Sequence, residues 1–367
     1  MSKRKNIYRF IFAGGGTGGH LYPAIAVAEQ IRLLKPEAEI LFVGTKHKIE
    51  ARVVPQYKFD FKTIWISGFA RKLNLKNLLF PIKLFVALIQ SLIINIKFKP
   101  RTAIGTGAYV AGPIIWAASV LGSKIILLEQ NSYPGVTNRL LEKRADEIHI
   151  SFEDSREYFR EKDKLMLTGN PLRINLKLTD KKVSRESLGL QADKKTLLVF
   201  GGSLGARSLN EALKNNYEKL LRADIQIVWQ AGELYFDEYR SFNSSKVKVV
   251  PFFDNMSEAL SAADLIVARA GATSIAELSY LGLPVVFVPS TNVSADHQYK
   301  NAHSLEVENA AVILRDNEVS DKLYETVTTL IKDEEKLKLL SENIKKFSKP
   351  DAAKIIAGNA IKLAERI

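Results

Sequence analysis

Two glycine-rich turns, each between an apolar run and an amphipathic segment, constrain the fold of this chain more than any other feature. The first, GGGTGGH at residues 14–20, follows IYRFIFA and precedes LYPAIAVAEQIRLLK. The second, GGSLGARS at residues 201–208, follows TLLVF and precedes LNEALKNNYEKLL. Each pattern predicts a strand, a tight turn and a helix, and a β-rich segment follows both, EAEILFVGT and IQIVWQAG. The repeat therefore predicts two halves that each begin with a parallel βαβ unit.

The rest of the chain supports two Rossmann-like α/β domains. At 367 residues the chain is too long for one ordinary hydrophobic core. Strand-like runs alternate with helical stretches in both halves, as this fold requires; they are KIILLEQ, DEIHIS, VKVVPF, DLIVAR and PVVFVPS. Gly169, Asn170 and Pro171 interrupt the alternation. We predict domains at residues 1–168 and 169–367, with the last helix able to pack back onto the first domain.

Composition excludes several classes of protein. The chain has no cysteine, so disulfides, thiolate metal sites and a cysteine nucleophile are excluded, which suits a reducing cytoplasm. Arg9 interrupts the short apolar run near the N-terminus, which favours a first strand over a signal peptide. The net charge of +13 could attract nucleic acid, anionic lipid or a phosphorylated substrate. No basic and aromatic cluster and no nucleic-acid-binding motif occurs, so we expect no nucleic-acid partner.

The glycine turns favour a ligand that carries phosphate. Glycines at a strand-to-helix turn let a ligand approach the bare backbone, and the helix start offers N–H groups and a positive dipole end. Neither turn ends in the Gly-Lys-Ser/Thr of a Walker A loop, and the first resembles GxGxxG only loosely. A nicotinamide-dependent oxidoreductase would need an acidic residue after the second strand, where Gly44, Thr45 and Lys46 stand. The structural alternative is glycines that serve only the turn.

Five more polar stretches stand where strands are expected to end, and such loops converge on one ligand site in open α/β sheets. They are GTGAYVAGP (105–113), EQNSYPGVTNRLL (129–141), GNPLR (169–173), ARAGATSIAEL (268–278) and STNVSADHQYKNA (290–302). Together with the two glycine turns, in this order from about residue 8 to about residue 303, they resemble the MurG family of peptidoglycan glycosyltransferases. The resemblance implies the GT-B fold, two Rossmann-like domains facing across a cleft, with the donor held mainly by the C-terminal one.

The same resemblance implies an activity and its partners. The expected reaction is an inverting transfer of GlcNAc from UDP-GlcNAc to undecaprenyl-pyrophosphoryl-MurNAc-pentapeptide (lipid I), which gives lipid II for peptidoglycan synthesis. The expected location is the cytoplasmic face of the cell membrane, where the enzyme is peripheral and meets the cell-wall and division machinery. The alternative is that the chain is another GT-B enzyme, such as a glycolipid synthase or a UDP-sugar epimerase. The epimerase would show catalytic carboxylates and would need no lipid surface.

The resemblance also assigns a UDP-GlcNAc site. The helix start offers its backbone amides to the diphosphate, and its residues are Ala272, Thr273, Ser274, Ile275 and Ala276. Glu277 accepts the ribose hydroxyls, Arg173 binds the pyrophosphate and Ser203 donates to a phosphate oxygen. The backbone of Phe253 contacts the uracil edge. The remaining assigned residues face the donor sugar and its phosphates: Thr17, Gly18, Gly19, Asn131 and Gln298.

Each assignment has a structural alternative. Glu277 could be a solvated helix residue, Arg173 a surface ion pair, and Phe253 part of the core. Ser203 could cap a helix, which is compatible with binding phosphate. Some family members have two adjacent glutamines where this chain has His297 and Gln298. The chain therefore departs from the family pattern at the residues expected to select GlcNAc.

His20 is the candidate catalytic residue. Inversion requires a base that takes the proton from the acceptor hydroxyl, and a histidine titrates near neutrality. A helix N-terminus disfavours the charged ring and so keeps it basic. The alternative is that His20 binds the acceptor or supports the loop. No Asp-x-Asp motif occurs, so we expect no metal and no cofactor; backbone amides, helix ends and Arg173 compensate the leaving-group charge.

The most apolar stretch is NLLFPIKLFVALIQSLIINIKFKP (77–100), which Pro81, Lys83 and Gln90 interrupt. We predict an amphipathic helix that docks on an anionic membrane surface without crossing it. The basic residues expected around its apolar patch are Lys72, Lys76, Lys83, Lys97, Lys99 and Arg101. The alternative is a core helix followed by a loop.

Overall fold

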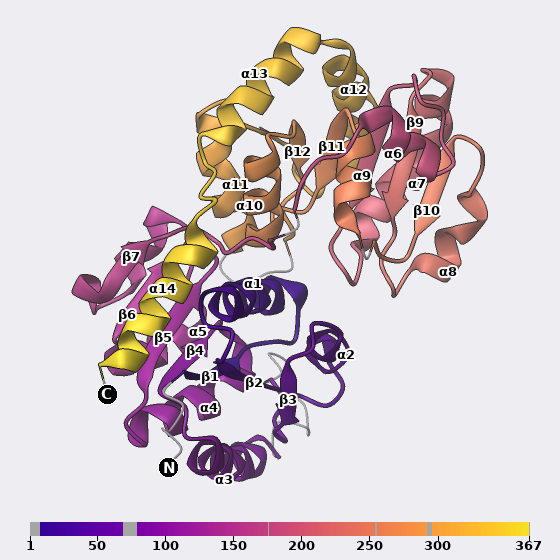
Figure 1. The fold of residues 1–367 in the computed structure, drawn as a ribbon. Coiled ribbons are helices and arrows are strands. Elements are labelled where there is room, and N and C mark those ends of the chain that lie inside the picture. Colours follow the sequence, from indigo (N-terminus) through magenta and orange to yellow (C-terminus); the bar gives the residue numbers. More distant parts are fainter. Residues whose placement is uncertain (1–7, 69–78, 175, 254, 292–295, 367) are drawn as a thin grey trace. The chain divides into compact units, whose positions relative to one another are not determined.

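The computed structural model describes residues 8–68, 79–174, 176–253, 255–291 and 296–366. The chain forms two compact units (Figure 1), the first comprising Met1–Ile174 with Lys349–Ile367 and the second Asn175–Ser348. Each unit contains one parallel sheet, with the first strand inside the sheet. The six strands of the second sheet repeat the order of the first six strands of the first sheet. The predicted fold class, two Rossmann-like domains, is confirmed.

The first unit is built on the sheet order β3-β2-β1-β4-β5-β6-β7. Its strands are β1 Arg9–Ala13, β2 Glu39–Gly44, β3 Asp60–Thr63, β4 Thr102–Gly105, β5 Lys124–Glu129, β6 Glu147–Ile150 and β7 Leu165–Leu167. Its helices are α1 Gly18–Leu34, α2 Ile49–Gln56, α3 Phe80–Phe98, α4 Ala108–Val120, α5 Val136–Leu141 and α14 Ala352–Glu365, with 3₁₀ turns at Glu142–Arg144, Glu153–Tyr158 and Lys162–Lys164. The strand order reverses between β1 and β4, where α/β folds bind ligands.

The core of the first unit has two layers because successive side chains of a strand point to opposite faces of the sheet. Phe10 and Phe12 of β1 pack on the side of α1 and α14. Ile11 and Ala13 pack on the side of α4. Both faces are covered, so the strand is a continuous apolar run rather than an alternating one.

The second unit has the sheet order β10-β9-β8-β11-β12-β13. Its strands are β8 Thr196–Phe200, β9 Gln226–Gln230, β10 Val247–Val250, β11 Leu265–Ala268, β12 Val285–Phe287 and β13 Val312–Ile313. Its helices are α6 Lys181–Ser187, α7 Arg207–Arg222, α8 Phe236–Tyr239, α9 Met256–Ala262, α10 Ala272–Leu281, α11 His297–Val307, α12 Val319–Lys332 and α13 Glu334–Lys345, with a 3₁₀ turn at Arg240–Phe242. Trp229, Leu213 and Val327 join β9, α7 and α12 in one buried cluster.

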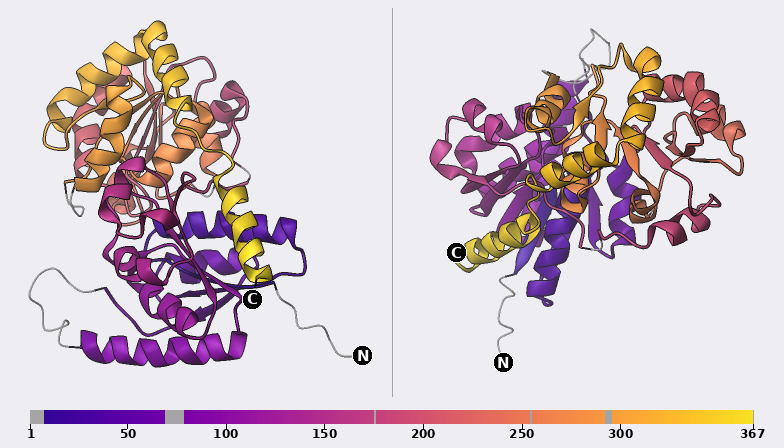
Figure 2. Two further views of the ribbon diagram at one scale, coloured as in Figure 1. Left: turned by 90° about the vertical axis from the view of Figure 1, so that its left-hand side faces the viewer. Right: turned by 90° about the horizontal axis from the view of Figure 1, so that it is seen from above.

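The C-terminal helix α14 belongs to the first unit, although the expected second domain ran to residue 367. Figure 2 shows α14 beside α1. Ile356 and Ala360 are buried in the same cluster as Phe10. The Thr102 hydroxyl donates to the Ala360 carbonyl at 3.1 Å, and the Asn359 amide donates to Glu147 at 2.9 Å. The last helix is therefore part of the core that supports β1 and β4.

Candidate functional site

The glycine-rich turn after β1 combines two kinds of glycine. A Cβ at Gly14 would collide with the Thr106 hydroxyl, and one at Gly15 would lie 2.6 Å from the carboxyl carbon of Glu50. Gly16 has a φ of +80°, and a Cβ there would meet no described atom within 4 Å. The first two glycines therefore make room for neighbouring side chains. Gly16 leaves open space where a Cβ would stand, although its N–H donates to Glu50 at 2.9 Å.

The start of α1 presents backbone N–H groups at the carboxyl edge of the sheet. Thr17 is the N-cap residue with φ −144° and ψ 161°, and its side chain makes no capping bond to a described residue. The first turn contains no acidic residue. Gly18 and Gly19 thus open a helix whose first amides lack intrahelical acceptors and whose dipole is positive at this end. Such a helix start favours an anion.

His20 is held in one orientation by the loops after β4 and β5. Its Nδ1 lies 2.8 Å from the Thr106 carbonyl oxygen and 3.2 Å from Oε1 of Gln130. A carbonyl only accepts, so Nδ1 carries a hydrogen, and in the neutral ring the lone pair lies on Nε2. Gly107 has a φ of +94°, and a Cβ there would lie 3.1 Å from the His20 ring. These contacts fix the orientation of the ring and, for the neutral ring, the tautomer whose lone pair lies on Nε2.

Asn131 lies in a loop that a buried carboxylate organises. Glu129, at the end of β5, is 2% exposed. It accepts from the Asn131 N–H at 3.0 Å, from the Gly135 N–H at 2.9 Å and from the Asn138 amide at 2.9 Å. The sequence analysis assigned Asn131 of the EQN motif to the site. In the structure, Glu129 of the same motif holds the loop in place.

Arg173 stacks on the ring of Tyr22 within the first unit. Its guanidinium carbon lies 4.9 Å from the ring centroid of Tyr22, a residue of α1. Burial raises the pKa of Glu29, and the charges of Arg32 and Arg173 oppose that rise. Stacking limits the orientations of the guanidinium, which suits a group that has to meet an anion.

The second unit repeats the helix-start arrangement at α10. Gly271 is its N-cap residue, and the Ile275 N–H donates back to the Gly271 carbonyl at 2.9 Å. The helix begins at Ala272, and its first five residues are those assigned to the diphosphate, Ala272, Thr273, Ser274, Ile275 and Ala276. Glu277 follows one turn after Thr273 on the same face. Ser203 lies in the turn after β8, the strand beside β11, so both segments stand at this unit's strand-order reversal.

A polar network that the sequence analysis missed supports the turn before α10. Arg269 donates to the Val288 carbonyl at 2.9 Å, to Asp316 at 2.7 Å and to the Ser208 hydroxyl at 2.6 Å. The side chains of Arg269 and Asp316 are each 11% exposed. The network joins β11, the end of β12 and the start of α7, so it fixes the loops that surround the α10 N-terminus.

Two residues predicted to bind UDP-GlcNAc form hydrogen bonds within the second unit. The side chain of Phe253 is 7% exposed, and its backbone N–H donates to Oε1 of Gln230 at 3.1 Å. Its side chain is therefore part of the core, as the alternative stated, and its backbone N–H is bonded within the unit. Oε1 of Gln298 accepts from the Ser290 N–H at 2.9 Å. This bond directs the amide of Gln298 along the loop after β12.

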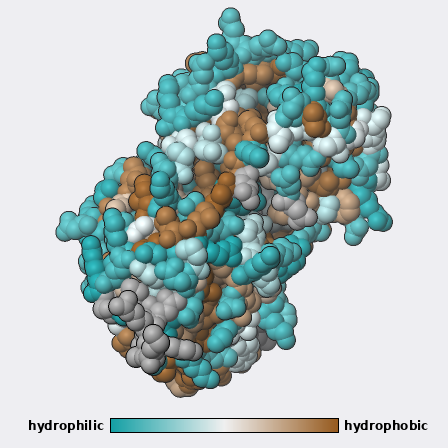
Figure 3. All heavy atoms as spheres, viewed as in Figure 1, coloured by the Kyte–Doolittle hydropathy of each residue, from teal (hydrophilic) through white to brown (hydrophobic). Residues whose placement is uncertain are grey.

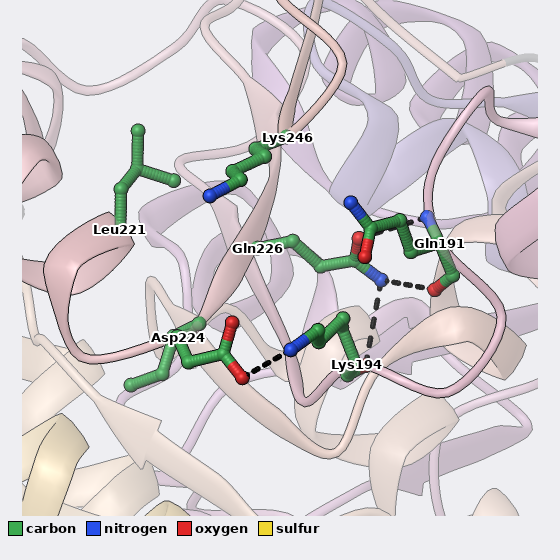
Figure 4. Close-up of a pocket in the computed structure, with 7 residues that line it drawn as sticks. Gln191, Lys194, Leu221, Asp224, Gln226 and Lys246 are labelled. Atoms are coloured by element: carbon green, nitrogen blue, oxygen red, sulfur yellow. Dashed lines mark hydrogen bonds and ion pairs between the residues drawn. The ribbon is translucent and has the colours of Figure 1, made fainter.

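A small pocket lies at the amino ends of β8, β9 and β10 (Figure 4). It is lined by Gln191, Lys194, Leu221, Asp224, Ile225, Gln226 and Lys246. Gln226 donates to the Gln191 carbonyl at 2.7 Å and accepts from its N–H at 3.0 Å, while Lys194 pairs with Asp224. These contacts tie a loop to the beginning of β9. The pocket contains none of the predicted site residues.

Comparison with known proteins gives matches along nearly the whole chain. The glycosyltransferase family 28 N-terminal domain matches residues 10–150, and the family 28 C-terminal domain matches residues 196–356. A UDP-N-acetylglucosamine–N-acetylmuramyl-(pentapeptide) pyrophosphoryl-undecaprenol N-acetylglucosamine transferase from Flavobacterium psychrophilum is 43% identical and covers 98% of both chains. The enzyme of the same name from Christiangramia forsetii is 43% identical over 97% of both chains.

Solved structures agree with these matches. The crystal structure of Acinetobacter baumannii MurG has a TM-score of 0.71 and 28% identity, and the match covers 96% of this chain and 99% of that one. A UDP-GlcNAc 2-epimerase from Neisseria meningitidis has a TM-score of 0.66 at 14% identity, covering 96% of this chain and 99% of that one. The second likeness shows a shared fold alone.

Proposed function

The chain belongs to glycosyltransferase family 28, and from this membership we infer that it transfers GlcNAc from UDP-GlcNAc to undecaprenyl-pyrophosphoryl-MurNAc-pentapeptide, giving lipid II. The observation that carries the inference is the 43% identity over 98% of both chains to an enzyme named for this reaction. The epimerase alternative rests on fold likeness at 14% identity, and the oxidoreductase alternative has no support in the family match. The chain is a UDP-GlcNAc-dependent hexosyltransferase of the GT-B fold.

We propose that His20 acts as the general base. As the acceptor hydroxyl oxygen forms its bond to the anomeric carbon, Nε2 takes the hydroxyl proton, and the bond from that carbon to the UDP oxygen breaks with its electron pair on UDP. The Nδ1 hydrogen bonds to the Thr106 carbonyl and Gln130 support this role, because they fix the tautomer and stabilise the imidazolium that forms. Attack from the face opposite UDP inverts the anomeric configuration.

We propose that the second unit binds the UDP moiety at the α10 start. The amides of residues 272–276 and the Ser203 hydroxyl would donate to the diphosphate, and Glu277 would accept from the ribose. Arg173 would add a permanent positive charge, and Thr17, Gly18, Gly19, Asn131 and Gln298 would surround the sugar and its phosphates. Donors fixed before the reaction compensate the charge that develops on the leaving group.

We propose that α3 docks the enzyme on an anionic membrane surface at its cytoplasmic face. Its exposed apolar residues follow helical spacing, at Ile82, Phe85, Ile89, Ile93 and Ile96. Brown surface appears at the lower margin of the molecule in Figure 3, where α3 lies in Figure 1. By length and composition alone α3 could also cross a membrane. Its other face, however, packs on its own unit, so docking in the interface is favoured over crossing.

One face of α3 packs against α4 of the same unit. Ala87 and Ile94 are buried in the same cluster as Ile114 of α4, and the Asn95 amide reaches the Ile114 carbonyl at 3.4 Å. Lys83, near the start of α3, lies over the exposed Trp65 ring at 5.8 Å. Lys97, Lys99 and Arg101 follow at the other end, whereas Lys72 and Lys76 lie outside the described residues. The basic positions at both ends support binding to anionic headgroups.

One assay tests the reaction. Labelled UDP-GlcNAc incubated with a lipid I analogue should give a labelled disaccharide-lipid and UDP. His20→Ala serves as the control for chemistry in the proposed site. Formation of a 2-epimer from UDP-GlcNAc without any acceptor, with no disaccharide-lipid product, would replace the transferase by an epimerase.

A further inference from the structure

Glu50 is a buried carboxylate directly beneath the glycine-rich turn. It is the second residue of α2 and is 1% exposed. Its Oε2 accepts from the Gly16 N–H at 2.9 Å, and its Oε1 accepts from the Thr45 N–H at 2.9 Å and the Thr45 hydroxyl at 2.8 Å. Within the described part of the chain, no Lys, Arg or His forms an ion pair with it. These three donors and the positive end of α2 therefore offset its burial.

The surrounding backbone is shaped to admit this side chain. A Cβ at Gly15 would lie 2.6 Å from the Glu50 carboxyl carbon, and one at Gly44 would collide with the Glu50 side chain. Burial raises the pKa of Tyr109 in α4, the charge of Glu50 raises it further, and a hydrogen bond with Thr45 opposes the rise. Glu50 thus connects the turn after β1 with the turn after β2.

We propose that Glu50 is a positioning residue for the transfer reaction, because it holds the glycine-rich turn and so sets the place of His20. The proposal rests on the proposed function. Gly16 immediately precedes the N-cap residue Thr17, and His20 is the third residue of α1. A shift of Gly16 would therefore move the helix start and the base together. Glu50 also occupies the Gly16 N–H, which leaves the amides of α1 itself for a substrate.

The role requires a carboxylate and not merely a polar side chain. Both oxygens of Glu50 accept from a backbone N–H. A glutamine has one accepting oxygen, and its NH₂ group would face a backbone N–H, donor against donor. Glu50→Gln keeps the volume of the side chain and breaks one of these two bonds. It is therefore the variant that separates positioning from packing.

Glu142 provides a matched control. It is 6% exposed and accepts from the Arg160 N–H at 2.7 Å, so it is also a buried carboxylate that holds a backbone amide in the first unit. Its partner lies in the 3₁₀-rich segment after β6, outside the glycine-rich turn. Glu142→Gln removes a buried carboxylate without moving His20; because its remaining oxygen can still accept from the Arg160 N–H, its melting temperature should fall no more than that of Glu50→Gln.

The experiment measures kcat, both KM values and the melting temperature of the full chain. For Glu50→Gln we expect kcat to fall by about tenfold or more, since small misplacements of reacting groups are costly. The protection by UDP against heat should stay nearly unchanged, because the proposed UDP contacts lie mainly in the second unit. The KM for UDP-GlcNAc should rise modestly, since Thr17, Gly18 and Gly19 move with the turn. Glu142→Gln should keep kcat within about twofold, below the loss expected from misplacement. Wild-type kcat in Glu50→Gln, or equal losses in both variants, would overturn the proposal while the wild-type transferase activity stands.

A milder variant covers the case in which Glu50→Gln does not fold. Thr45→Val removes the hydroxyl donor and keeps both backbone bonds of Glu50. We expect this variant to fold and to lower kcat by about threefold. The loss should be smaller than that of Glu50→Gln, because both backbone bonds of Glu50 remain. Unchanged kcat in this variant, with the hydroxyl bond lost, would overturn the proposal. An inactive wild-type enzyme would instead overturn the proposed function.

Discussion

The Nδ1 atom of His20 lies 2.8 Å from the carbonyl oxygen of Thr106, and this contact decides which ring nitrogen is available. His20 belongs to the helix after β1, and Thr106 follows β4, the neighbouring strand at the order reversal. The carbonyl has no hydrogen to give, so Nδ1 donates and, in the neutral ring, the lone pair lies on Nε2. The arrangement holds the ring in the orientation that the proposed general base would need.

Replacing His20 tests this assignment. His20→Ala should lower kcat by about a hundredfold or more, the usual contribution of general base catalysis. The affinity for UDP should stay nearly unchanged, because the proposed UDP contacts lie mainly in the second unit. The pH–rate profile should lose its acid limb, because no group would titrate in the proton transfer. A higher acceptor KM with unchanged kcat and an intact acid limb would make His20 an acceptor-binding residue.

Replacing Glu277 tests the donor site. UDP should raise the melting temperature of the wild-type protein, because a ligand that binds only the folded state stabilises it. Glu277→Ala should reduce that rise, since the ribose hydroxyls lose their proposed acceptor. Glu325→Ala, an exposed glutamate on α12, is the control and should leave the rise intact. Equal protection by UDP and NAD would show that the donor assignment is wrong.

The sequence predicted the architecture because its strongest signals are local. The run TLLVF coincides with β8, and each glycine turn opens a helix at the expected place. The sequence analysis named no range for β3, β4, β7 or β13, which span two to four residues and lack a long apolar run. β4 is central in its sheet, yet its four residues TAIG give little periodicity to detect.

The supporting residues of the site could not be predicted in the same way. In the sequence, Glu50 and Asp316 look like ordinary charged residues near the end of a turn. Their burial arises only when segments far apart in the chain come together, as Glu50 meets Gly16 and Asp316 meets Arg269. The position of α14 follows from similar long-range packing, since Ala360 meets Thr102 across the sequence.

Changes on the exposed stripe of α3 test membrane docking. Phe85→Ser with Ile93→Ser should weaken binding to anionic lipid vesicles, because these side chains would enter the interface. Leu234→Ser, an equally exposed apolar residue in the second unit, should leave vesicle binding unchanged. Raised salt should also weaken binding by screening the basic residues. Turnover of a water-soluble acceptor analogue should hardly change. Unaltered vesicle binding in the double variant would exclude the stripe as the docking surface.

Acid should loosen the attachment of α14 to β6 through Glu147. A hydrogen bond from His149 lowers the pKa of Glu147 below its ordinary value of 4.5, the charge of His149 and a hydrogen bond from Asn359 lower it further, and burial opposes them. Because the folded pKa is the lower one, the stabilisation is fully present above pH 4.5 and is lost as the pH falls through the folded value. Melting temperatures measured from pH 7 to pH 3 should therefore fall less steeply below about pH 4.5 in Glu147→Gln than in the wild type. Glu161→Gln, which removes a surface partner of Lys164, should keep the wild-type slope. An unchanged slope in Glu147→Gln would mean that other carboxylates control the acid sensitivity of the first unit.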